Sequence, residues 1–179
     1  STSPCGWVVD LRTNTGGNPS AMLAAIGPIL GEGPAGLFVY PDGATRTWAY
    51  RAGQVLIDQE TAAVVAGPDY RLRQSEPPVA LLTGRTTASA GETIVVAFRQ
   101  RPNTRSFGQP TGGLTTAIDS FELSDGAMLL LSVATFADRT GQVYDGPMAL
   151  DKIVADRDPD AAMQAALDWL QNQPACAKP

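Results

Sequence analysis

The stretch that decides the fold runs from residue 78 to residue 99 and reads PVALLTG, RTTASAGE and TIVVAFR in turn. The first part is short and apolar and follows a proline, which is typical of a buried parallel strand. The last part is apolar and stops shortly before Pro102, which predicts a buried helix. Ser89 therefore stands where a strand passes into a helix.

Ser89 has two possible roles at this junction. Backbone N–H groups at a helix start point outward and favour negative charge. A serine nucleophile placed there would have hydrogen-bond donors beside it for the oxyanion that it creates. The alternative is that Ser89 only caps the helix, which is the usual role of serine at such a position. The motif by itself favours the cap.

A second strand–turn–helix pattern lies near the start of the chain. It reads GWVVDLR (6–12), TNTGGN (13–18) and PSAMLAAI (19–26), with proline in the first helical turn. Gly16 and Gly17 allow the backbone to approach a ligand closely and to present its N–H groups. The turn is either a tight connection or part of an oxyanion hole. A phosphate loop fits poorly, because no Gly-Lys-Ser/Thr follows.

Three motifs occur in a recognisable order: VVDLRTNTGG (8–17), TASAGE (87–92) and GQPTGG (108–113). Together they resemble the catalytic core of the C-terminal processing (tail-specific) serine proteases, a family that includes the tricorn core and the interphotoreceptor retinoid-binding protein modules. The resemblance extends from about residue 6 to residue 154. It implies that Ser89 is the nucleophile, and that Ala90 with Gly16 or Gly17 supplies the oxyanion hole.

The general base of this family is missing from the chain. Leu114 occupies the position of the base in the Ser–Lys branch, and we expect it to pack as an apolar wall near Ser89. The tricorn-like branch uses a histidine from an N-terminal region, but this sequence contains no histidine. In that branch a glutamate orients the histidine, and the nearest carboxylate here is Asp145, which is either that group or, more simply, a solvated turn residue. We assign Glu92, in the first turn of its helix, a structural role.

Two explanations for the missing base remain open. In the first, residues 1–179 are one domain, the C-terminal catalytic core of a peptidase whose N-terminal region is missing. The histidine would then come from that region or from a second chain. In the second, the core is catalytically inactive and serves binding. We favour the first, because the neighbourhood of Ser89 is intact and residues 1–5 lead directly into a core strand.

Composition predicts one globular domain, with 44% hydrophobic and 17% charged residues. A net charge of −5 without a basic patch argues against nucleic acid as a partner, and no apolar run has the length of a membrane span. Without histidine or a Cys-x-x-Cys pair we expect no metal site and no cofactor.

The two cysteines, Cys5 and Cys176, lie near opposite ends of the sequence. They are either unrelated buried thiols or a disulfide that closes almost the whole chain. Domain termini often lie close together, and relatives in the resembled family are commonly exported. We therefore favour the disulfide, and with it a secreted, cell-envelope or periplasmic location.

The predicted fold is α/β, of the crotonase/Clp-protease-like kind, with a twisted, largely parallel sheet, flanking helices and β-hairpins. We predict hairpins at 37–50 and 121–133, a strand at 54–57, and an apolar helical stripe of Met163, Ala166, Leu167 and Leu170. Tyr40, Trp48 and Tyr50 either line a substrate groove or, more simply, pack on the sheet.

The predicted function is that of a serine endopeptidase, which cleaves peptide bonds in peptides or unfolded proteins through an acyl-enzyme on Ser89. The isolated chain should be inactive because it lacks the base. One alternative is a non-catalytic module that binds a peptide or a lipid-like ligand on the same core. Another is a non-proteolytic acyl-transfer or hydrolytic enzyme on a crotonase-like core.

Overall fold

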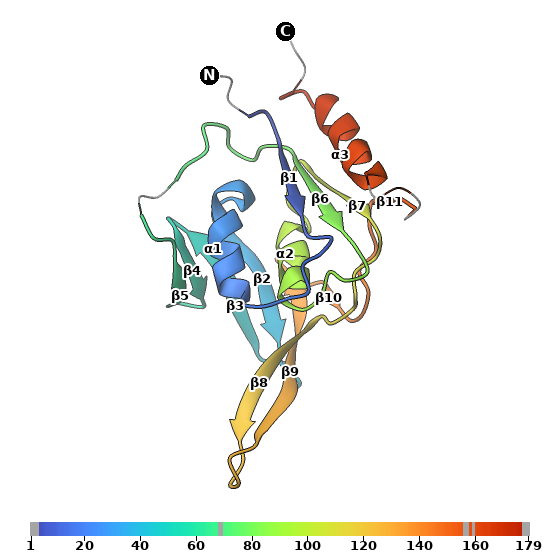
Figure 1. Cartoon of the computed structure of the whole chain (residues 1–179). Coiled ribbons are helices and arrows are strands. Elements are labelled where there is room, and N and C mark those ends of the chain that lie inside the picture. Colours follow the sequence, from blue (N-terminus) through green and yellow to red (C-terminus); the bar gives the residue numbers. More distant parts are fainter. Residues whose placement is uncertain (1–3, 68–69, 156–157, 159, 177–179) are drawn as a thin grey trace.

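The computed structural model describes residues 4–67, 70–155, 158 and 160–176. The described strands form two sheets, one parallel with four strands and one antiparallel with seven. The helices α1 (Pro19–Leu30) and α2 (Ala90–Phe98) pack on each other between the sheets, and α3 (Ala161–Gln171) packs on the outer face of the parallel sheet (Figure 1). The fold therefore alternates sheet and helix layers.

The parallel sheet has the order β1 (Trp7–Asp10), β6 (Val79–Thr83), β7 (Thr104–Gly108) and β11 (Lys152–Ile153). Strand β6 is buried at every residue, as its apolar sequence predicts. Val79 and Leu81 belong to the core that includes α1 and α2, whereas Ala80 and Leu82 contribute to a second core with α3. Because helices cover both faces, this strand needs no polar face.

The antiparallel sheet has the order β10 (Val143–Tyr144), β9 (Met128–Asp138), β2 (Gly33–Val39), β3 (Thr45–Arg51), β4 (Gln54–Ile57) and β5 (Glu60–Val64). Strand β8 (Thr116–Glu122) pairs with the remaining length of β9. The prediction of a largely parallel sheet is therefore wrong, since the fold is a mixed α/β arrangement with more antiparallel than parallel strands. The physical reason is the short loops between residues 33 and 64, because such loops can join only antiparallel neighbours.

Most predicted local elements are confirmed. The hairpins at 37–50 and 121–133 form as β2–β3 and β8–β9, and β4 matches the predicted strand at 54–57. In α3, Ala166 and Leu170 are buried but Leu167 is exposed, so the apolar stripe is narrower than predicted. The helix touches only one sheet face, and Leu167 lies off that line of contact.

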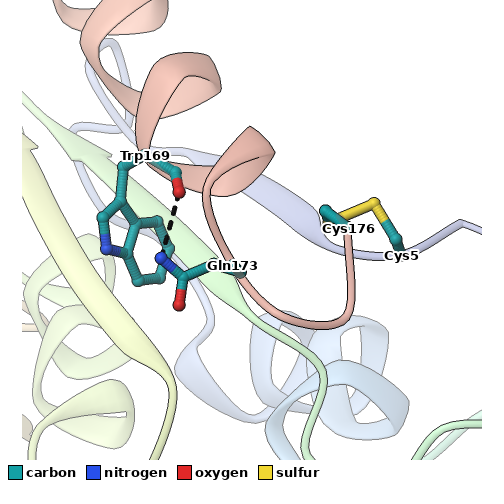
Figure 2. Close-up of a disulfide and its surroundings, with 4 residues drawn as sticks. All are labelled: Cys5, Trp169, Gln173 and Cys176. Atoms are coloured by element: carbon teal, nitrogen blue, oxygen red, sulfur yellow. Dashed lines mark hydrogen bonds between the residues drawn. A yellow bond between two sulfur atoms is a disulfide. The ribbon is translucent and has the colours of Figure 1, made fainter. Parts of the chain in front are cut away.

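The predicted disulfide between Cys5 and Cys176 is present, with 5.0 Å between the two Cα atoms (Figure 2). It joins the segment before β1 to the segment after α3, across a sequence separation of 171 residues. Nearby, Gln173 Nε2 donates a hydrogen bond of 3.0 Å to the carbonyl of Trp169, whose ring packs on Phe107. Cys5 and Cys176 are therefore held together, next to a helix that packs on the parallel sheet.

A buried arginine secures the end of α1. The Arg101 guanidinium donates hydrogen bonds to the carbonyl oxygens of Ile29 and Leu30 in the last turn of the helix, and also to Pro77. Burial lowers the pKa of Arg101 to about 10, so the side chain is still charged at neutral pH. A cation at the carboxyl end of a helix is stabilised by the helix dipole and pairs with carbonyls that lack helical partners.

Candidate active site

Ser89 lies at the sharp turn between β6 and α2 and has φ of 52° and ψ of −120°. A positive φ is uncommon for a residue with a side chain and is a strained conformation. Strain of this kind is kept when the surrounding structure enforces it, and a sharp strand-to-helix turn exposes the nucleophilic serine in other hydrolase folds. Ser89 is thus the N-cap of α2, as the simpler reading of the motif predicts, but its positive φ differs from the extended backbone that such residues usually have.

Glu92 holds this turn in place from inside the protein. It is fully buried, its Oε2 accepts the Ser89 N–H at 3.0 Å, and its Oε1 accepts the Gly113 N–H at 2.8 Å. The carboxylate therefore ties the TASAGE turn to the TGG turn. Because the Ser89 N–H is already bonded to Glu92, it is not free to donate to a ligand.

Asn14 connects the first glycine turn to the start of α2. Its backbone carbonyl accepts the Ala88 N–H at 3.1 Å, and its side-chain Oδ1 accepts the Gly16 N–H at 3.0 Å. A Cβ placed on Gly91 would lie only 2.8 Å from the Asn14 carbonyl oxygen, so glycine permits this close contact. Hydroxyl hydrogen bonds of 2.7 Å from Thr86 and Thr87 to carbonyls of the first segment reinforce the connection.

The structure distinguishes the two glycines proposed for the oxyanion hole. Both have left-handed backbones, with φ of 122° at Gly16 and 130° at Gly17. The Gly16 N–H is used by Asn14, and a Cβ on Gly16 would lie 3.0 Å from the Cβ of Ser89. Among the described residues, the N–H groups of Gly17 and Ala90 form no hydrogen bond. These two donors are therefore available to a ligand.

Gly17, Ser89 and Ala90 line one cavity of about 300 Å³. Its apolar walls come from the antiparallel sheet and include two phenylalanine rings, Phe38 and Phe136. Its polar side chains include Tyr40, Arg46 and Asp119. The cavity therefore combines a serine, two N–H donors and an apolar wall, which are features of a serine hydrolase site other than its general base.

A larger cavity of about 390 Å³ opens at the carboxyl ends of β1 and β6 but does not include Ser89. Asp10, Arg12 and Arg85 are among its charged residues. Asp10 and Arg12 form an ion pair of 2.7 Å, and the hydrogen bond from Arg12 lowers the pKa of the Asp10 carboxyl. This internal pairing reduces the charge that the cavity offers to a ligand.

Two residues singled out in the sequence do not join the Ser89 cavity. Leu114 is 61% exposed, so the prediction that it packs as a wall near Ser89 is wrong. The preceding Gly113 is fixed by Glu92 and packs tightly against Pro147, and the chain then turns its next side chain to solvent. Asp145 is exposed in the loop after β10 and is not among the residues that line the cavity.

Sequence reasoning missed most of the cavity wall. Of the three aromatic residues considered for a groove, Tyr40 lines the cavity, whereas Trp48 and Tyr50 are buried in the core. Arg46 and Asp119 were not anticipated, because strand pairing between distant segments brings them to the cavity of Ser89.

No helix in the described parts of the chain is long and apolar enough to cross a membrane. Those same parts contain no cluster of three or more potential metal-binding side chains.

The strained serine at a strand-to-helix turn and the adjacent N–H donors resemble the arrangement found in serine hydrolases. A model of peptidase family S41 matches residues 2–150, and the chain belongs to that family. The nisin-resistance protein of Lactococcus lactis subsp. lactis is 28% identical over 168 residues, which are 94% of this chain and 50% of that protein. A chloroplastic carboxyl-terminal-processing peptidase 2 of Arabidopsis thaliana is 33% identical over 78 residues, 40% of this chain and 15% of that protein.

Solved structures show the same architecture. A lipoprotein from Streptococcus agalactiae superposes with a TM-score of 0.77 at 28% identity, over 95% of this chain and 55% of that one. The photosystem II D1 C-terminal processing protease shares the fold, with a TM-score of 0.62 at 20% identity, over 96% of this chain and 40% of its own. This chain thus spans about half the length of the nisin-resistance protein and of the lipoprotein.

Proposed function

We propose that the chain is the catalytic core of a serine endopeptidase that cleaves peptide bonds through an acyl-enzyme on Ser89. The observation that supports this most directly is the cavity where Ser89 lies beside the N–H groups of Gly17 and Ala90, neither of which is bonded to a described residue. Membership in peptidase family S41 supports the same chemistry.

In this mechanism the Ser89 Oγ attacks the carbonyl carbon of the scissile bond while a general base takes its proton. The carbonyl oxygen becomes an anion and accepts hydrogen bonds from Ala90 and Gly17. Gly16 is the weaker candidate for this role, because its N–H already donates to Asn14. The base then protonates the leaving amine, and water later releases the acyl group and restores Ser89.

The general base in this proposal is a histidine from outside residues 1–179, on an N-terminal region or on a second chain, as in the tricorn-like branch of the family. Two findings support it: the sequence has no histidine, and it spans about half the length of the relatives above. The isolated chain is then inactive. The role of Asp145 as the group that orients this histidine, and the crotonase/Clp-protease-like classification of the core, stay predictions.

The proposed substrates are peptides or unfolded proteins, and the proposed location is the cell envelope or the exterior. The Cys5–Cys176 disulfide supports the location, because disulfides persist in oxidising compartments. The names of two relatives, a nisin-resistance protein and a lipoprotein, point the same way.

A second function, non-catalytic binding of a peptide or a lipid-like ligand, uses the same cavity. The absence of a base from the sequence and the aromatic wall formed by Phe38 and Phe136 favour it. In that case ligand affinity would depend on the walls of the cavity and not on the Ser89 hydroxyl.

A fluorophosphonate probe, which reacts with activated serines, distinguishes the two functions in the complete gene product. We expect the probe to label Ser89, and Ser89→Ala to abolish both labelling and peptide cleavage, whereas Ser75→Ala, at an exposed serine outside the cavity, leaves both intact. Gly17→Ala should slow labelling because it distorts an N–H donor, and the loss of one such donor typically costs ~10²–10³ in rate. Gly43→Ala, also at positive φ but in open space, is the matched control.

Labelling that persists in Ser89→Ala would reject Ser89 as the nucleophile. A complete product that binds peptide but neither cleaves it nor reacts with the probe would favour the binding module.

A further inference from the structure

The β8–β9 hairpin extends away from the rest of the molecule (Figure 1). Along residues 118–122 and 128–132 each strand pairs only with the other, and every one of these residues is exposed. A two-stranded ribbon without further contacts is marginally stable in water. The described residues provide no such packing for this part of the hairpin. Its stability therefore depends on contacts from elsewhere.

Both faces of the hairpin carry large apolar side chains. Because residues alternate between faces, Phe121, Leu129 and Leu131 share one face, whereas Ile118, Met128 and Leu130 share the other. These six side chains are between 42% and 64% exposed. An ordinary solvent-facing ribbon would have one polar face, so apolar side chains on both faces mark an interaction surface.

The charges on the hairpin define the chemistry of its partner. Residues 116–132 contain three acidic residues, Asp119, Glu122 and Asp125, and no basic one. A second copy of the hairpin would oppose these carboxylates with like charges, which is unfavourable. A complementary partner presents apolar side chains flanked by lysine or arginine.

We propose that the β8–β9 hairpin is the docking site for the part of the complete protein that lies outside residues 1–179. The chain matches 94% of its own length to only 50% of the nisin-resistance protein, so a comparable length of polypeptide is available in such a relative. A bound peptide substrate would reach the strand edge beside Ser89 but would not cover both faces of the ribbon. An additional region of that size can enclose the ribbon on both sides.

Docking at this site also affects the Ser89 cavity. Residues 116–119 at the base of β8 line that cavity together with Val133 of β9. A region that encloses the hairpin therefore extends the wall of the cavity and brings its own side chains close to Ser89. This step rests on the proposed function, whereas the docking itself does not.

The test uses the complete gene product with a photo-crosslinking benzophenone amino acid in place of Leu130 or, on the opposite face, Phe121. We expect each to crosslink to peptides of the same polypeptide that lie outside residues 1–179. The control position is Glu60 on β5, whose side chain is 87% exposed and which should give no such product. Mixing isotopically light and heavy protein separates crosslinks within one chain from crosslinks between copies.

Four outcomes overturn the proposal: crosslinks between copies, crosslinks confined to residues 1–179, no crosslinks from either face, or a complete gene that encodes no further region. Hydrogen exchange gives an independent readout without substitution, since amides 118–131 should be protected in the complete product and exchange rapidly in residues 1–179 alone. The crosslinks should persist in Ser89→Ala, so failure of the peptidase proposal leaves the docking result interpretable. Leu130→Glu should remove the protection and, if the link to the cavity holds, reduce probe labelling of Ser89.

Discussion

Two apolar strand segments of this protein have similar sequences and opposite surroundings. VALLT in β6 is buried at every residue, whereas MLLLS at the start of β9 is exposed at every residue. The difference lies in their neighbours, because β6 has β1 and β7 beside it and helices on both faces, whereas this part of β9 has only β8. The apolar composition of a segment thus predicts that the segment tends to be buried. It does not show that the surface which buries the segment belongs to the described chain.

The same contrast applies to acidic residues. Glu92 and Asp138 are buried and hydrogen-bonded, whereas the acidic residues of the hairpin are exposed. A buried carboxylate is tolerated only where donors compensate for lost hydration. The acidic residues of the closed core and of the open hairpin should therefore contribute very differently to stability.

Removing the disulfide should destabilise the core and leave the hairpin unchanged. For the double variant Cys5→Ser, Cys176→Ser we expect the free energy of unfolding in urea to fall by about 4 kcal/mol, because the cross-link restricts a very long loop in the unfolded chain. Amide exchange in residues 118–131 should be as fast in this variant as in the wild-type chain of residues 1–179. A loss below ~1 kcal/mol would show that the bridge contributes little to the core.

A matched pair of truncations tests the contrast directly. Leu82→Ala, at a residue with 0% exposure in β6, should cost about 3 kcal/mol of unfolding free energy, because it leaves a cavity in a closed core. Leu130→Ala, at a residue with 64% exposure in β9, should change stability by less than ~0.5 kcal/mol. Equal losses in residues 1–179 would mean that the hairpin packs on this chain after all.

Glu92 should stabilise the folded state through its two hydrogen bonds. Glu92→Ala leaves the partly buried N–H groups of Ser89 and Gly113 without an acceptor, for an expected loss of ~2 kcal/mol in unfolding free energy. The matched control is Glu122→Ala, at an exposed carboxylate of the hairpin, which should be nearly neutral. If Glu92→Ala retains full stability, Glu92 does not fix this turn.

Of these residues, Asp138 should contribute least to the free energy of unfolding, and its contribution should depend on pH. Burial would raise the pKa of Asp138, but hydrogen bonds from Thr140, Tyr144 and two backbone N–H groups lower it below its ordinary value. A lowered folded-state pKa stabilises the protein above the unfolded-state pKa of about 4 and loses that effect as the pH falls further. Asp138→Asn should therefore cost on the order of 1 kcal/mol at pH 7.

The stability difference between wild type and Asp138→Asn should shrink as the pH is lowered from about 4, since the native carboxylate becomes protonated. Urea unfolding at several pH values measures it. A difference that grows towards acid pH would contradict the assignment, and so would one that does not change with pH.

The sequence predicted local structure well where one segment carries its own signal. The strand–turn–helix patterns around Gly16 and Ser89, the hairpins at 37–50 and 121–133, and the helix boundary at Pro19 follow from apolar runs and turn residues. The sheet type was predicted wrongly although the hairpins were recognised, because the pairing of β2 with β9 that joins them into one antiparallel sheet links segments about a hundred residues apart and leaves no local trace. For the same reason Asp119 and Arg46 could not be placed beside Ser89 from sequence.

The sequence by itself determined the motif order, and with it the family, the serine and the absence of histidine. Only the tertiary structure decided that Gly17 and Ser89 line one cavity, that Leu114 faces solvent, and that Glu92 joins two turns. The physical reason is that chemical identity belongs to single residues. Hydrogen-bond occupancy and burial depend on which distant segments meet, and here the strand pairing and the helix layer between the two sheets settled both.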